Sequence, residues 1–234
     1  MCTLYSQTRS RNEVANWLRV SDNRATMFEP LHAIFPSELA PVMRLAPDGE
    51  RELVQMNWGF LLLQDGRAPR RVVNVRDDKI LSSKFWRGSF DKRRCIVPAS
   101  SYCEPKGEKP ATWHWFAING DHSRPLFAFP GIWRSYTGPV RKSGETVTQE
   151  VYSILTTEPN ELTATINHER MPVLLSNDDE IETWLNGSTT EAMKLARRLP
   201  GERMSIVQSG VDREDLLGEI HGPIVRDPEL PNLS

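Results

Sequence analysis

RCIVPASSYCEP, residues 94–105, decides how the middle of the chain is expected to fold. Its first half, residues 94–99, is a short β-branched run bounded by Pro and Ser, which is typical of a strand. Segments of the same kind follow at residues 112–119, 125–130 and 151–157. Residues 53–60 and 71–75 predict two earlier strands, and residues 205–208 are expected to close the sheet.

Helical periodicity is expected in five segments, residues 12–20, 79–90, 158–166, 178–185 and 190–199. Thr157 is expected to cap the third of these, and Pro159 suits its first turn. Strands and helices do not alternate regularly. We therefore predict an α+β fold, one domain on a mostly antiparallel, partly barrel-like β-sheet with flanking short helices. Its core is expected over residues 2–215 and a C-terminal tail over residues 216–234.

The composition excludes several classes of protein. Apolar residues make up 38% of the 234 residues and charged residues 26%, with seven Trp and eight Phe, so the chain is not disordered. No apolar run reaches the ~20 residues of a membrane span, and the first residues lack a signal-peptide pattern. The sparse cysteines, Cys2, Cys95 and Cys103, fit a reducing compartment. We expect a cytoplasmic protein that acts as a monomer and has no membrane partner.

The charge is concentrated in one segment. Residues 67–94 hold ten Lys or Arg and three Asp, a net charge of +7, whereas the whole chain carries −2 and the remainder therefore −9. A local basic segment is what a groove for a polyanion requires, although a solvated surface is the more common explanation for a charge run taken alone.

Most familiar catalytic motifs are absent from the sequence. It contains no GxGxxG, P-loop, HExxH, GxSxG or CxxC pattern, and its five histidines are not spaced as metal ligands. We therefore expect no metal and no cofactor, and the chemistry must come from Cys2 and dispersed polar residues.

Cys2 directly follows the initiator methionine. Methionine is removed when the second residue is small, and Cys2 would then carry a free α-amine beside its thiol. The amine titrates at about 7.7–8.0 and the thiol at about 8.5 in model peptides, so both are expected to be partly nucleophilic near neutral pH. The amine can condense with an aldehyde, and the thiol can close the product to a thiazolidine ring. Taken alone, however, Cys2 is more simply a small second residue.

Three further segments accompany Cys2, and they are RRVVNVRDDK (residues 70–79), RRCIVPASSYCEP (93–105) and INHERMPVLL (166–175). Together with the N-terminal MC, and in this order and spacing, they resemble the SOS response-associated peptidase (SRAP) family. MNWGF (56–60) and MSIVQSGVDRED (204–215) also resemble family segments, so the resemblance runs from residue 2 to about residue 215. It implies a sensor of abasic sites in single-stranded DNA that protects the lesion in the DNA damage response. The sensor forms a covalent thiazolidine DNA–protein crosslink and removes its own first methionine.

The resemblance also implies roles for single residues. Cys2 would be the nucleophile, Glu104 the general acid and base, and Asn74 would orient the N-terminal residue or the sugar. His168 would help to open the sugar ring and could drive the reverse reaction. Candidates for contact with DNA are Arg76 at a phosphate, Thr157 in the pocket, Arg70, Arg71, Lys84, Arg87, Arg93 and Arg94 along the groove, and Trp58 and Trp86 stacked on flanking bases. A core position is the more common one for a tryptophan, and helix capping is an equal alternative for Thr157.

The chain departs from the family pattern at several positions, which puts the DNA contacts in doubt more than the chemistry. Leu4 stands where the family often has arginine, Asp78 where it has glutamate, and Pro105 where an aromatic residue is common. Two alternatives stay open. An N-terminal-nucleophile amidohydrolase would also begin with Met-Cys, and a noncatalytic single-stranded DNA-binding module would make Cys2 incidental.

Overall fold

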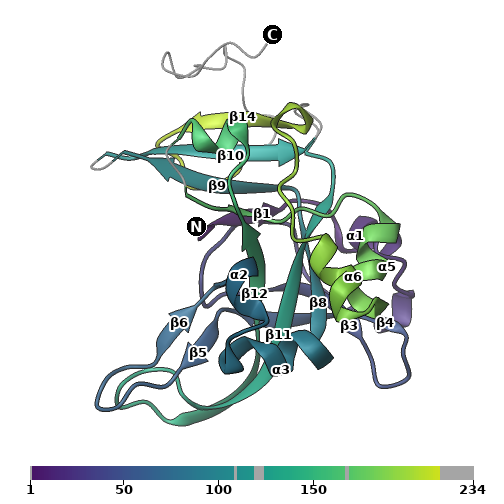
Figure 1. Cartoon of the computed structure of the whole chain (residues 1–234), viewed down its shortest axis with the longest axis vertical. Coiled ribbons are helices and arrows are strands. Elements are labelled where there is room, and N and C mark those ends of the chain that lie inside the picture. Colours follow the sequence, from purple (N-terminus) through teal and green to yellow (C-terminus); the bar gives the residue numbers. More distant parts are fainter. Residues whose placement is uncertain (1, 108–109, 119–123, 167–168, 217–234) are drawn as a thin grey trace.

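Two β-sheets dominate the computed structural model, which describes residues 2–107, 110–118, 124–166 and 169–216 (Figure 1). The first is a five-stranded antiparallel sheet in the order β14-β10-β9-β1-β2. Its strands are β1 (Tyr5–Gln7), β2 (Leu31–Ile34), β9 (Ser101–Lys106), β10 (Thr112–Ile118) and β14 (Met204–Gly210).

The second sheet closes on itself. Its strands run in the order β11-β8-β3-β4-β12, and β12 pairs again with β11, so that these five strands form a barrel. They are β3 (Leu39–Leu45), β4 (Arg51–Trp58), β8 (Arg94–Ala99), β11 (Phe127–Pro139) and β12 (Thr146–Thr157). Two short strands, β7 (Asn74–Arg76) and β13 (Met171–Pro172), add to β12, and β12 runs parallel to β4 and β7. The mostly antiparallel, partly barrel-like α+β fold predicted from the sequence is confirmed.

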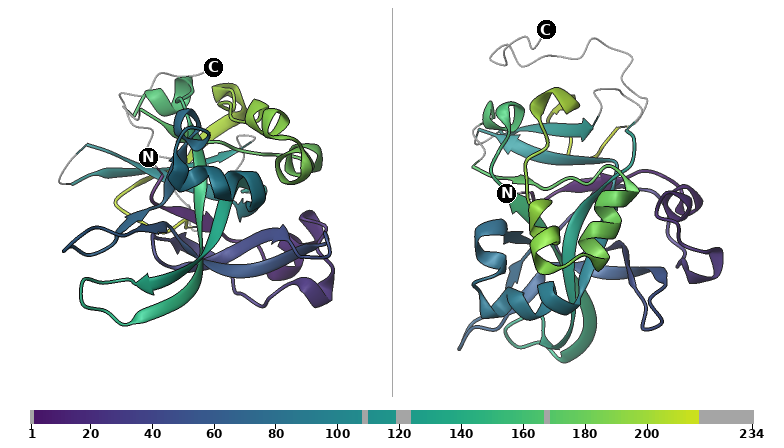
Figure 2. Two further views of the ribbon diagram at one scale, coloured as in Figure 1. Left: turned by 60° about the horizontal axis from the view of Figure 1, so that its bottom comes forward. Right: turned by 45° about the vertical axis from the view of Figure 1, so that its right-hand side comes forward.

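Short helices flank the two sheets (Figure 2). They are α1 (Arg11–Trp17), α2 (Asp77–Ile80), α3 (Lys84–Lys92), α4 (Glu161–Ala164), α5 (Asp178–Asn186) and α6 (Thr189–Lys194). Helices α5 and α6 lie side by side, and the Trp184 indole of α5 donates hydrogen bonds to the carbonyls of Cys95 and Gly131 at 3.0 and 3.1 Å. No helix in the described ranges is long and apolar enough to cross a membrane.

Gly59 interrupts the strand predicted over residues 53–60. Its φ of 107° lies in the left-handed region, and a Cβ there would stand 2.5 Å from the Arg71 side chain. The chain therefore turns at Gly59 and continues as β5 (Phe60–Leu62), which pairs with β6 (Arg70–Val72). The strand predicted over residues 71–75 is likewise divided between β6 and β7.

Local capping corrects two of the predicted helices. The helix expected over residues 79–90 is two helices, because the Ser83 hydroxyl accepts a hydrogen bond from the Phe85 amide and starts α3 anew. The helix expected over residues 158–166 is only α4. Its cap is Asn160, whose Oδ1 accepts from the Thr163 amide at 2.8 Å, so the expectation that Thr157 caps it is wrong.

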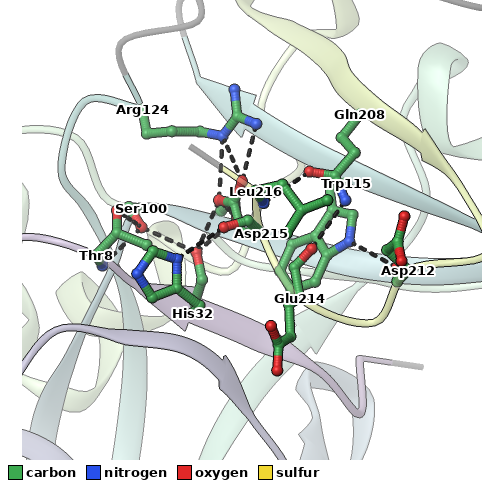
Figure 3. A network of polar contacts seen from close by, with 12 residues as sticks. Thr8, His32, Ser100, Trp115, Arg124, Gln208, Asp212, Glu214, Asp215 and Leu216 are labelled. Atoms are coloured by element: carbon green, nitrogen blue, oxygen red, sulfur yellow. Dashed lines mark hydrogen bonds and ion pairs between the residues drawn. The ribbon is translucent and has the colours of Figure 1, made fainter. Parts of the chain in front are cut away.

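Residues 211–216, here called the C-terminal strap, are fastened to the five-stranded sheet through Asp215 (Figure 3). The fully buried Asp215 carboxylate accepts hydrogen bonds from Ser6 at 3.0 Å and Ser101 at 2.5 Å and pairs with Arg124 at 2.8 Å. Its carbonyl lies 2.8 Å from His32 Nδ1. Because Ser6 belongs to β1, the strap helps to fix the strand that follows Cys2. Residues 217–234 lie outside the described residues, so the predicted tail stays a prediction.

Replacing Asp215 by Asn should be strongly destabilising. The Asp215→Asn change leaves the Arg124 cation buried without its counter-charge, and loss of one partner of a buried pair costs about 3–5 kcal/mol. Urea denaturation should show a drop in the free energy of unfolding of that order. The matched control is Asp22→Asn, which removes the surface partner of Arg11 and should change stability little. Equal effects of the two changes would contradict the role assigned to Asp215.

Candidate functional site

Strand pairing brings Cys2 into the interior beside β9. Tyr5 of β1 lies opposite Tyr102 of β9, and the pairing continues toward the N-terminus, where the Cys103 amide donates to the Leu4 carbonyl at 2.9 Å. The Cys2 side chain is fully buried, and its Sγ lies 3.5 Å from the Leu4 carbonyl. The second residue of the chain is therefore a fixed part of the core.

Asn74 holds Cys2 from the opposite side. It begins β7, which runs parallel to β12 with Asn74 opposite Ile154. The Asn74 Nδ2 donates a hydrogen bond to the Cys2 carbonyl at 2.8 Å. Within the described residues its Oδ1 is buried without a hydrogen-bond partner. A buried acceptor of this kind costs free energy of folding unless a ligand, or the chain after loss of Met1, donates a hydrogen bond to it. This contact is the one that an orienting role for Asn74 requires.

Glu104 is the buried acid of the site. It lies on β9 on the same face as Tyr102, which packs in one apolar cluster with Cys2. Its side chain is fully buried, and burial raises its pKa from 4.5 to about 7. A carboxyl group with such a pKa is present in both protonation states near neutral pH, as a general acid and base requires.

The Cys2 thiol does not behave as the sequence predicts. Burial, together with the negative charge of Glu104, raises the pKa of the Cys2 thiol far above its ordinary value. The expectation that this thiol is partly ionised near neutral pH is therefore wrong for the folded chain. The charge of the Glu104 carboxylate does not ease this ionisation, so the carboxylate can assist only by accepting the proton of the thiol.

Thr157 lies at the end of β12 and takes part in a polar cluster that the sequence analysis missed. Its Oγ1 donates to Asp77 Oδ2 at 2.7 Å. Asp77 also pairs with the guanidinium of Arg170, which donates to the Thr156 carbonyl at 2.6 Å. Arg170 stands in the same quoted segment as His168, and Asp77 in the same quoted segment as Asn74, but neither was given a role. His168 itself lies outside the described residues, and its role stays a prediction.

The basic candidates differ in what their guanidinium or ammonium groups do. Arg70, Lys84, Arg87 and Arg76 are exposed, although Arg87 pairs with Asp91 at 2.8 Å and Arg76 with Asp78 at 2.8 Å. Arg71 is half-buried and donates to the carbonyls of Trp58 and Gly59 at 3.1 and 3.0 Å. The expectation that Arg71 faces DNA is therefore replaced by a structural role at the Gly59 turn.

The half-buried Arg93 and Arg94 are also tied to the backbone. Arg93 donates to the Trp133 carbonyl at 3.2 Å, and Arg94 to the Gly187 carbonyl at 2.6 Å. Three of the ten cations counted between residues 67 and 94 therefore support the fold, and the other seven are exposed.

Trp58 and Trp86 occupy the core rather than the surface. Trp58 is fully buried, stacks on Tyr152 with ring centroids 6.4 Å apart, and donates its indole N–H to the Val73 carbonyl. Trp86 is 7% exposed and packs on Phe60. The prediction that these rings stack on bases is wrong for their positions in this structure, because a base could reach either ring only after it left the core.

The raised pKa of Glu104 makes stability depend on pH. A carboxyl group whose pKa is about 7 when folded and about 4.5 when unfolded favours folding below pH 4.5, and this contribution is lost as the pH rises through 7. Glu104→Gln should abolish this loss of stability at high pH, because glutamine does not ionise. Its free energy of unfolding should match the wild type at pH 4.5 and exceed it by up to roughly 3 kcal/mol at pH 8 in urea titrations. A difference independent of pH would contradict the burial of an ionisable Glu104.

Sequence comparisons find a family model and named relatives that match most of the chain. The family model described as "SOS response associated peptidase (SRAP)" matches residues 1–212. The abasic site processing protein YoqW of Bacillus subtilis (strain 168) is 31% identical over 167 residues, which cover 70% of this chain and 70% of that protein. The abasic site processing protein HMCES of Gallus gallus is 28% identical and covers 86% of this chain and 66% of its own length.

Solved structures share the fold. A protein from Bacteroides thetaiotaomicron has a TM-score of 0.68 at 25% identity, covering 87% of this chain and 90% of its own. A protein from Bordetella bronchiseptica has a TM-score of 0.67 at 19% identity, covering 90% of this chain and 99% of its own. With the family match spanning nearly the whole described region, the chain belongs to the SOS response-associated peptidase (SRAP) family.

Proposed function

We propose that this protein processes abasic sites in single-stranded DNA by forming a covalent crosslink through Cys2. The observation that carries the proposal is the convergence of Cys2, Asn74 and the buried Glu104 at one point of the fold. The relatives named as abasic site processing proteins support the lesion as substrate. Removal of Met1, which we propose the protein carries out itself, exposes the α-amine that the chemistry needs.

The bonds of the crosslink form in two stages. The Cys2 amine gives its extra proton to Glu104 and attacks the C1′ aldehyde of the ring-opened deoxyribose, which forms a carbinolamine. Glu104 returns the proton to the carbinolamine hydroxyl, the C–O bond breaks, and water leaves an iminium ion. The Cys2 thiol then loses its proton to Glu104, and the sulfur bonds to the same carbon to close the thiazolidine.

The raised pKa of the thiol sets this order. A protonated, buried thiol is a weak nucleophile, so the amine reacts first. The iminium carbon that results is a strong electrophile, and its positive charge favours the thiolate beside it. The hydrogen bond from Asn74 to the Cys2 carbonyl keeps the residue oriented through both stages. His168 would help to open the sugar ring, as the family resemblance implies.

The exposed cations supply a surface for the DNA backbone. Arg76 ends β7, two residues after Asn74. The other exposed candidates are Arg70 on β6 and Lys84 and Arg87 on α3. Such side chains bind phosphates without reading bases, which suits a protein that must find a lesion in any sequence.

Mass spectrometry of the intact protein tests the proposal. Purified protein should lack Met1 and should gain the mass of an oligonucleotide on incubation with abasic single-stranded DNA, but not with undamaged DNA. Cys2→Ala should lose the adduct, whereas Cys103→Ala, which removes a buried thiol on the other face of β9, should keep it. Salt-sensitive binding without an adduct would instead support a noncatalytic DNA-binding module. Hydrolysis of an amide by Cys2 would support an N-terminal-nucleophile amidohydrolase.

The Arg76–Asp78 pair should weaken DNA binding. Arg76 Nε and Nη2 lie 2.9 and 2.8 Å from the two carboxylate oxygens of Asp78, so a phosphate must displace that carboxylate. Asp78→Asn should tighten binding of single-stranded DNA roughly two- to fivefold at low salt, measured by fluorescence anisotropy, and the gain should shrink as salt rises. Asp48→Asn, which breaks the pair with Arg24, is the control and should have no effect. Unchanged affinity for Asp78→Asn would remove Arg76 from the DNA surface.

A further inference from the structure

A row of three polar side chains crosses the five-stranded sheet at the site. Glu104 of β9 lies directly opposite His114 of β10, and His114 lies directly opposite Ser209 of β14. Side chains at directly opposite positions project from the same face, with Cβ atoms about 4.5–5.5 Å apart. The His114 Nδ1 and Ser209 Oγ atoms are 2.8 Å apart.

The row lies on the Cys2 side of the sheet. Tyr102 of β9 and Phe116 of β10 are also directly opposite each other, two positions along from Glu104 and His114, and both pack in the apolar cluster that contains Cys2. Because side chains of a strand alternate between faces, Glu104 and His114 share that face. His114 is fully buried and Ser209 is half-buried, so the row leads from the buried acid toward solvent.

The proposed chemistry leaves Glu104 with a proton to dispose of. Glu104 takes one proton from the α-ammonium of Cys2 and returns it when water departs, and then takes a second from the thiol. Each adduct formed from the ammonium therefore releases one net proton, and that proton ends on a carboxyl group with no exposed surface. The reverse reaction requires the same proton to return, so a buried Glu104 needs a route for protons.

We propose that His114, hydrogen-bonded to Ser209, moves protons between Glu104 and solvent. The inference rests on the proposed function. An imidazole can accept a proton at one ring nitrogen while it gives up the proton of the other. Nδ1 faces Ser209, so Nε2 is the nitrogen that exchanges with the Glu104 side. His114 acts through Glu104 and is therefore a positioning residue.

The thiol and phenol groups around the row stay neutral near pH 7, whereas the positive charge of the amino terminus acts on Glu104 and lowers its pKa. Burial raises the pKa values of Cys2 before β1 and of Tyr102 and Cys103 on β9 far above their ordinary ranges. Arg213 and Asp215 of the C-terminal strap act on Cys103 from the other face of the sheet. Glu104 and His114 occupy directly opposite positions, so the proposal expects their titrations to be coupled.

Two measurements on the full chain test the inference. In carbon-13 NMR titrations without DNA, His114→Gln should shift the pKa of the Glu104 carboxyl by about 0.5 or more, because a neighbouring group that exchanges protons with it is lost. In stopped-flow reactions with abasic single-stranded DNA and a pH indicator, wild-type protein should release its proton together with adduct formation. His114→Gln and Ser209→Ala should release it about tenfold more slowly, with unchanged DNA affinity.

Ser205→Ala is the matched control, because Ser205 lies on β14 opposite Ala117 and outside the row, and it should behave as wild type. Wild-type values of both the Glu104 pKa and proton release in His114→Gln and Ser209→Ala would overturn the inference. If His114→Gln does not fold, proton release in Ser209→Ala decides. If wild-type protein forms no adduct, the proposed function fails, and the Glu104 titration alone supports or overturns the coupling of the row.

Discussion

The pairing of β1 with β9 is the constraint on which the site depends. It places Tyr5 opposite Tyr102 and Leu4 beside Cys103, so that Cys2, at the free end of the chain, is held in the core near Glu104. A chain end normally frays because few contacts hold it. Here the Asn74 hydrogen bond to Cys2 and the buried Asp215 network behind Ser6 remove that freedom. These contacts fix the position of Cys2, which is the residue that the proposed chemistry uses.

Burial gives the site its chemical character as well as its geometry. It raises the pKa of Glu104 to about 7, where a carboxyl group both gives and takes protons. It also raises the pKa of the Cys2 thiol, which in the proposed mechanism stays protonated until an iminium ion forms. The same burial separates Glu104 from water, and this is why we propose that protons reach it along the row through His114 to Ser209. In the proposed function, phosphates bind to exposed arginines and a lysine that do not belong to the buried site, so recognition of the backbone and chemistry at the sugar would be separated in space.

Local sequence patterns predicted much of the fold. The strand at residues 94–99 and the helix at residues 178–185 are found as β8 and α5, because apolar periodicity determines which side of each segment is buried. Trp58 and Arg71 were misassigned, since their contacts with Val73 and with the Gly59 turn exist only after distant strands meet. Asp77 was missed because its partner Arg170 lies 93 residues away.

The most direct test of the account is peptide mapping of the protein–DNA adduct. Crosslinked protein is digested with nuclease and protease, and the sugar remnant is located by tandem mass spectrometry together with amine and thiol reagents. The account predicts a remnant on Cys2 as the first residue of the chain, with neither its amine nor its thiol open to modification. A remnant on a lysine, a Cys2 that keeps a free thiol in the adduct, or an adduct on a chain that still carries Met1 would contradict it.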